Sequence, residues 1–149
     1  MKKAFFLLLF LTLSCGKEEE QRIPSSTVYC KVDLTLDRYK NLSTIGYGAG
    51  YSTGYYESDY MGYGGLYIVN TFVPYYTAFD MCCPVECQKN ITISKVEGSE
   101  DVKCNKCGSV YMVIDGTGYA KSGTAHDKGY SLQRYNVRNI DINNFLVVN

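Results

Sequence analysis

Four cysteines arranged in two pairs are the residues of this chain best suited to chemistry. Cys83 and Cys87 are separated by three residues, Cys104 and Cys107 by two, and sixteen residues lie between the pairs. The turn-forming Pro84 lies inside the first pair. Two short loops that each offer two thiolates are what a tetrahedral zinc site or an all-cysteine iron–sulfur site requires. The spacing therefore predicts a metal site at Cys83, Cys87, Cys104 and Cys107.

The same cysteines have an alternative chemistry if the protein is exported. Apart from Cys15 the chain contains six cysteines, an even number that fits three disulfides in an oxidising compartment. Cys82 is a disulfide candidate that can pair with Cys87 or Cys30. A disulfide between the two loops would join them mechanically as a metal does, so the sequence leaves metal and disulfide open, and it also leaves zinc and iron open.

The N-terminus has the pattern of an export signal. Lys2 and Lys3 precede an apolar run over residues 4–13, which is too short to span a bilayer. The run ends at Ser14-Cys15, which resembles the lipobox of bacterial lipoproteins. The resemblance implies a signal peptide over residues 1–14 and acylation of Cys15. An ordinary secretory signal with an incidental Cys15 is the alternative.

Residues 15–26 then form an extended tether in either case. The lysine and three glutamates at 17–20 resemble the surface-export signal of some Gram-negative lipoproteins, or they are a solvated spacer. We therefore expect an outer-membrane lipoprotein of the cell envelope, periplasmic or surface-exposed, whose first partner is the membrane through its lipid anchor. The formal net charge of zero argues against a nucleic-acid partner.

The rest of the chain, residues 27–149, predicts one all-β domain. Apolar residues alternate strictly with polar ones from Val28 to Leu36, which indicates a half-buried strand with Cys30 on its core face. A buried free thiol is the first expectation for Cys30, and a disulfide is the second. Residues 66–69 and 75–79 predict a hairpin, and further strands are expected at 91–94, 110–114, 132–137 and 140–148. No segment carries an amphipathic helical stripe with caps.

Two glycine-rich stretches are expected to connect the strands, residues 46–65 as a long loop or a mobile hairpin and residues 116–130 as a loop. Residues 46–65 contain seven glycines and six tyrosines, and residues 116–130 are also punctuated by glycine. The first of these loops is a candidate contact surface for a ligand.

The cysteine loops resemble those of Rieske-type iron–sulfur domains, particularly small exported Rieske-like lipoproteins. Residues 78–84 lead into the first loop, and the second reads Cys-Asn-Lys-Cys-Gly-Ser-Val-Tyr over residues 104–111. The family has Cys-x-His in the first loop and Cys-x2-His-Gly-Ser-x-Tyr/Phe in the second. The resemblance implies an antiparallel β-sandwich or barrel with an inserted two-loop subdomain at about residues 80–112, and electron transfer with a redox partner protein.

The departures from that family change the expected metal chemistry. Val85 and Cys107 occupy the positions of the two histidine ligands, and the single histidine, His126, lies beyond the second loop. A Rieske [2Fe–2S] centre needs two histidines on one iron, so a centre of the usual kind is not expected. Cys87 would instead complete a four-thiolate site like that of a rubredoxin or zinc-ribbon module, structural with zinc and electron-transferring with iron.

A second hypothesis is a non-enzymatic surface binding or structural lipoprotein with a vestigial cluster site and no cofactor. Catalysis is not expected: His126 and Asp127 lie in a glycine-rich loop with no geometric sign of a catalytic triad.

Overall fold

The alternating segment near the N-terminus forms the first strand of the structure, and it pairs with the last strand. The computed structural model describes residues 21–72 and 75–149, and in it strand β1 (Val28–Asp33) buries Val28, Cys30 and Val32 while the residues between them are exposed. The predicted core position of Cys30 is confirmed. Residues Leu34 and Leu36 continue the apolar pattern beyond the strand, and the 3-10 helix η1 (Lys40–Ser43) follows them.

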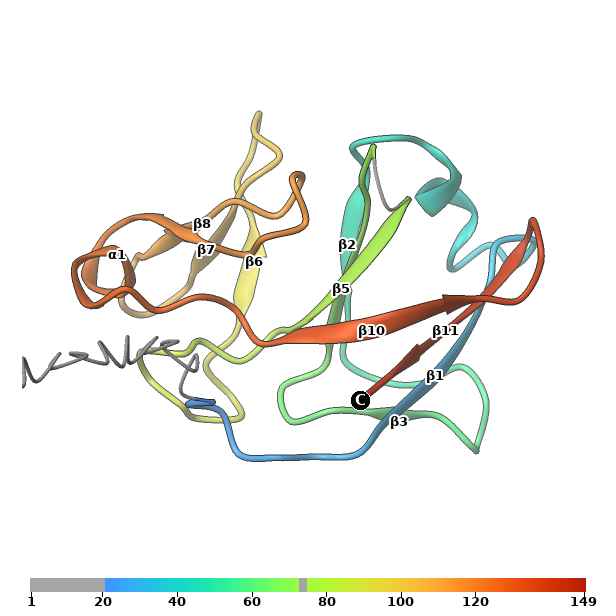
Figure 1. The fold of residues 1–149 in the computed structure, drawn as a ribbon, viewed down its shortest axis with the longest axis horizontal. Coiled ribbons are helices and arrows are strands. Elements are labelled where there is room, and N and C mark those ends of the chain that lie inside the picture. Colours follow the sequence, from blue (N-terminus) through green and yellow to red (C-terminus); the bar gives the residue numbers. More distant parts are fainter. Residues whose placement is uncertain (1–20, 73–74) are drawn as a thin grey trace, which may run out of the picture.

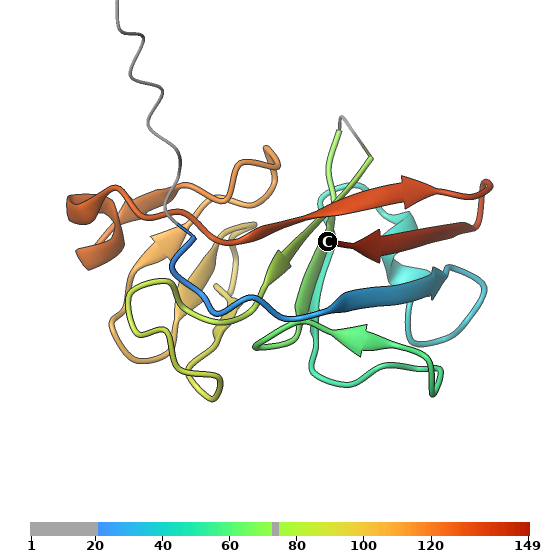
Figure 2. The ribbon, with the colours of Figure 1, turned by 60° about the horizontal axis from the view of Figure 1, so that its bottom comes forward.

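Seven antiparallel strands form a sheet that curls into a nearly closed barrel (Figures 1 and 2). Besides β1 they are β2 (Gly48–Tyr51), β3 (Tyr60–Met61), β4 (Leu66–Asn70), β5 (Tyr76–Asp80), β10 (Arg134–Asn139) and β11 (Asn144–Val148). Their order is β2-β4-β5-β10-β11-β1-β3. The expected hairpin of β4 and β5 is confirmed, with Leu66 opposite Asp80 and Asn70 opposite Tyr76.

A second, four-stranded sheet is inserted between β5 and β10 and lies beside the barrel (Figure 1). Its strands are β6 (Ile93–Lys95), β7 (Val102–Cys104), β8 (Val110–Tyr111) and β9 (Ala120–Ser122), and the short helix α1 (Thr124–Lys128) follows. The inserted part therefore continues past residue 112, where the sequence placed its end. Strands dominate both parts, which confirms the all-β class.

Strands β4 and β5 separate two hydrophobic cores because both of their faces are buried. Ile68 and Ala78 point into the barrel with Cys30, whereas Tyr67 and Phe79 point out of it, toward the second sheet. A strand that packs on both faces is apolar throughout, which explains why β4 reads as a continuous apolar run rather than as an alternating one. The second core is what positions the cysteine loops.

The two stretches expected to be loops contain ordered elements, so these expectations were wrong in part. Residues 46–65 supply β2 and β3, and residues 116–130 supply β9 and α1. Gly48 lets β2 lie close to β4, because a Cβ atom at Gly48 would lie 2.7 Å from the Tyr67 hydroxyl. The glycines therefore serve close packing between strands. Among the described residues no helix has the length and apolarity to cross a membrane.

Candidate metal centre

Three cysteines from two separate loops meet at the edge of the second core. Cys83 lies in the loop between β5 and β6, Cys104 ends β7, and Cys107 lies in the turn between β7 and β8. Their sulfur atoms all lie within 4.8 Å of one another, and those of Cys83 and Cys107 are 3.6 Å apart. The structure thus brings together three of the four cysteines predicted as metal ligands.

The β7–β8 turn shapes the second half of this cluster. The backbone N–H of Gly108 donates to the Cys104 carbonyl at 3.2 Å, and Gly108 adopts a left-handed conformation with φ of 73° that favours glycine. The turn directs the N–H of Lys106 at the Cys104 sulfur, at 3.4 Å. The Cys107 thiol donates to the Ser109 hydroxyl at 3.2 Å. A backbone N–H that donates to a sulfur atom favours the thiolate form.

The loop after β5 holds Cys83 from the opposite side. Its backbone N–H donates to the Ile91 carbonyl at 3.0 Å, and its carbonyl accepts the N–H of Cys87 at 2.9 Å. Just before it, the N–H of Cys82 donates to the buried Asp80 carboxylate at 2.7 Å. These bonds fix both ends of the loop that carries the first cysteine pair.

Two of the three thiols are buried, and the third is partly exposed. Cys83 and Cys104 are fully buried, whereas Cys107 is partly exposed. Burial raises the pKa of Cys83 to about 12. Burial acts in the same direction on Cys107, but hydrogen bonding with the Ser109 hydroxyl and backbone holds the pKa of Cys107 below its ordinary value. Burial also raises the pKa of Tyr111, whose hydroxyl lies 3.5 Å from the Cys83 sulfur.

The spacing of the sulfur atoms fits one metal ion. With a Zn–S bond of about 2.3 Å, the edge of a tetrahedron of thiolates is about 3.8 Å. The 3.6 Å between Cys83 and Cys107 is close to that edge. A two-iron cluster would divide its ligands between two irons, whereas this group of three converges within 4.8 Å. The donor set is soft, which favours zinc or iron over magnesium or calcium.

Cys87 is the predicted ligand that the structure leaves outside this group. Its thiol donates to the Pro84 carbonyl at 3.2 Å, and its backbone has a positive φ of 52°, unusual for a residue with a side chain. It is partly exposed and lies in the same loop as Cys83. Val85, at the position of a family histidine, packs against the second core and offers no ligand atom.

The remaining cysteines lie elsewhere. The Cys30 thiol faces the Tyr39 hydroxyl at 4.0 Å in the barrel core, and the Cys82 thiol donates to the Gln88 carbonyl at 3.3 Å. Each of the six cysteines in the described ranges is a free thiol, so the structure forms none of the disulfides considered for Cys30 and Cys82. The predicted lipidation site, Cys15, lies outside the described residues.

Two contacts at the site were missed by the sequence reading. Lys106 and Glu86 form an ion pair of 2.8 Å that joins the two cysteine loops, and the Ser109 hydroxyl also accepts the backbone N–H of Ala125 at 3.0 Å. The Gly-Ser dipeptide after the second pair was the signal for Ser109. His126 lies exposed on α1, beside Asp127 at 3.4 Å.

Comparisons with protein-family models, with curated proteins and with solved structures returned no match for this chain.

Proposed function

We propose that this protein is a lipid-anchored protein of the bacterial cell envelope in which one thiolate-bound zinc ion fastens the second sheet. Cys83, Cys104 and Cys107 supply three ligands, and Cys87 supplies the fourth when its thiol leaves the Pro84 carbonyl. An ion with four protein ligands has no open position for a substrate, so its role is structural.

The observation that carries the proposal is the convergence of three sulfur atoms within 4.8 Å from loops that are far apart in sequence. The second sheet has strands of only two or three residues, so it has few ladder hydrogen bonds of its own. An ion that ties the Cys83 loop to the β7–β8 turn would compensate for this, because metal binding contributes directly to folding free energy.

The envelope location rests on the resemblance of Ser14-Cys15 and the preceding apolar run to a lipobox. Together with the acidic residues that follow, it supports a domain held at a membrane by a short tether. Labelling of the expressed protein with a radioactive fatty acid, compared with a Cys15→Ser variant, tests this part. Equal labelling of both forms would refute it.

Metal analysis of protein purified without strong reductant tests the site. One zinc per chain, a colourless solution and loss of the metal in Cys107→Ser would support the proposal. Cys30→Ser is the matched control, because Cys30 is a buried free thiol in the other core. Metal-free protein with all six cysteines oxidised would contradict it and would favour the alternative of a surface binding module.

The partial exposure of Cys107 supports electron transfer as a second candidate function. A single iron ion in the same four-thiolate site would have one sulfur at the surface, where an electron can pass to a redox partner. A coloured, iron-containing preparation that cycles between two oxidation states would replace the structural proposal with this one.

A further inference from the structure

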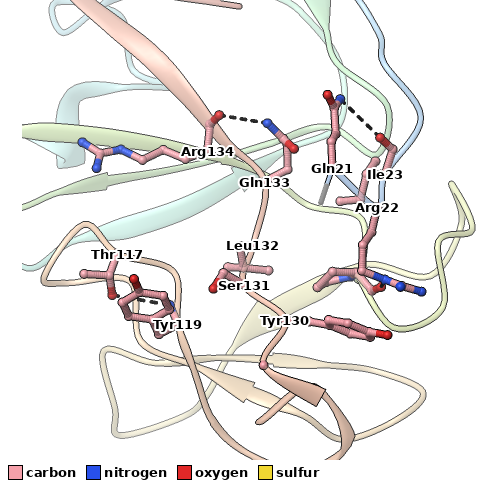
Figure 3. Close-up of a pocket in the computed structure, with 12 residues that line it drawn as sticks. Gln21, Arg22, Ile23, Thr117, Tyr119, Tyr130, Ser131, Leu132, Gln133 and Arg134 are labelled. Carbon is pink, nitrogen blue, oxygen red and sulfur yellow. Dashed lines mark hydrogen bonds between the residues drawn. The ribbon is translucent and has the colours of Figure 1, made fainter. Parts of the chain in front are cut away.

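A polar cavity lies next to the cysteine loops but takes no part in the metal site. It has a volume of about 500 Å³, within the range of small-molecule sites, and the segment 129–134 runs along it. In Figure 3, Thr117, Tyr119 and Arg134 lie on one side of this segment, and Gln21, Arg22 and Tyr130 lie on the other.

The cavity is positively charged in a protein with no net charge. Two of the four arginines of the chain, Arg22 and Arg134, line it, and its described lining contains no acidic residue. Among the described residues, no carboxylate forms an ion pair with either arginine. Arg134 also borders a second cavity of about 410 Å³ along β10 whose described lining likewise lacks Asp and Glu. Arg134 thus borders both cavities.

The arginines are held in different ways at the two sides. The Arg22 Nε donates to the Pro84 carbonyl at 2.9 Å, and its guanidinium lies 3.9 Å from the centre of the Tyr130 ring. Arg134 is exposed, and Figure 3 shows its guanidinium pointing away from that of Arg22. One small anion would not contact both groups, so the arrangement fits a ligand with negative charges at separate positions.

The rest of the lining is suited to sugars. The Tyr119 ring is 54% exposed and offers an apolar face, and Gln133, Ser131 and Thr117 offer amide and hydroxyl groups. Aromatic faces combined with such groups complement the C–H faces and hydroxyls of a pyranose ring. We propose that this cavity binds an acidic oligosaccharide, with a carboxylate-bearing sugar at each arginine. The inference goes beyond the metal site and does not depend on it.

Calorimetric titration of the full protein with trigalacturonate tests the proposal, with neutral maltotriose and inorganic sulfate as comparison ligands. We expect binding of trigalacturonate that weakens as salt is raised, and no measurable binding of maltotriose. Arg134→Gln should weaken binding about tenfold, as expected for one lost charge-assisted contact. Arg138→Gln is the matched control, because Arg138 is exposed on the same strand but lines neither cavity. Its affinity should change less than about twofold.

Three results would each overturn the proposal. Sulfate that binds as tightly as trigalacturonate would indicate a small-anion site only, and equal binding of maltotriose would show that the charge is irrelevant. An equal loss in Arg134→Gln and Arg138→Gln would indicate unspecific attraction. Thermal unfolding of each variant checks that the fold is intact, and zinc content checks that the metal site is unchanged.

Discussion

Replacement of Asp80 should destabilise the protein more than any other single change to a polar side chain described above. Asp80 is fully buried at the end of β5, where β5 leaves the barrel for the cysteine loop. Its carboxylate accepts four hydrogen bonds: from the backbone N–H of Tyr63 at 2.8 Å, of Gly64 at 2.9 Å and of Cys82 at 2.7 Å, and from the Tyr135 hydroxyl at 2.7 Å. Burial and the neighbouring Asp80 charge both raise the pKa of Tyr135, which keeps its hydroxyl a donor.

The expected cost follows from the number of donors that lose their acceptor. Asp80→Ala leaves all four without a partner, and at about 1 kcal/mol each the loss is about 4 kcal/mol. That is a large part of the stability of an ordinary domain. Tyr135→Phe removes one of these four hydrogen bonds and should cost about 1 kcal/mol. Asp80→Asn keeps one acceptor oxygen but turns an NH2 group toward donors, so its cost should fall between these values.

Urea unfolding of the wild type and the three variants, followed by circular dichroism, measures these differences. The double variant Asp80→Ala/Tyr135→Phe should cost less than the sum of its parts, because the two residues share one hydrogen bond. A cost below about 1 kcal/mol for Asp80→Ala would refute the reasoning, since it would mean that the four donors find other partners or water.

Three further predictions concern the metal site, a close contact and acid stability. Cys87→Ser should weaken zinc binding about a hundredfold, since one of four ligands accounts for about a quarter of some 12 kcal/mol of binding free energy. Competition with a chromophoric chelator measures the affinity for zinc. Wild-type affinity in the variant would show that the site uses three cysteines only. Gly64→Ala should destabilise the protein by about 2 kcal/mol in urea unfolding, because its Cβ atom would lie 2.5 Å from the Cys82 backbone nitrogen. Gly98→Ala, which meets no atom within 4 Å but has a φ of +71°, is the comparison that measures left-handed backbone strain without a clash. Hydrogen bonds from the Asn144 side chain and the Asn143 backbone hold the pKa of Asp141 below its ordinary value of 3.8, so the stability they contribute is complete above that value and is lost as the pH falls through the lower folded value. Asp141→Asn should therefore flatten the acid side of the curve of urea midpoint against pH, and an unchanged curve would contradict this assignment.

The pattern of apolar residues was enough to predict the strands that bury one whole face or both faces. Alternation revealed β1, because one of its faces is buried and the other is exposed. Continuous apolar runs revealed β4 and β5, which lie between two cores. Strand β3 has only two residues, Tyr60 and Met61, and its existence depends on pairing with β1, so no local pattern could show it.

The candidate site was predictable in its residue types but not in its full geometry. The turn between Cys104 and Cys107 is local, so spacing alone placed both thiols. The position of Cys87 depends on a positive φ angle and on a hydrogen bond to Pro84, which spacing does not reveal. The Asp80 network draws donors from three separate segments of the chain, and that arrangement follows only from the tertiary fold.

The pairing of the first and last strands has a consequence for the order of folding. β1 pairs along its length with β11. The Asn149 side-chain amide donates to the Ser26 carbonyl at 3.0 Å, and its oxygen accepts the N–H of Val28 at 3.1 Å. This pairing therefore joins segments more than a hundred residues apart, and contacts of such separation form slowly. During synthesis, the edge of β1 that pairs with β11 stays open until β11 has been made. Deletion of β11 would therefore leave one edge of β1 unpaired and free to pair with another molecule.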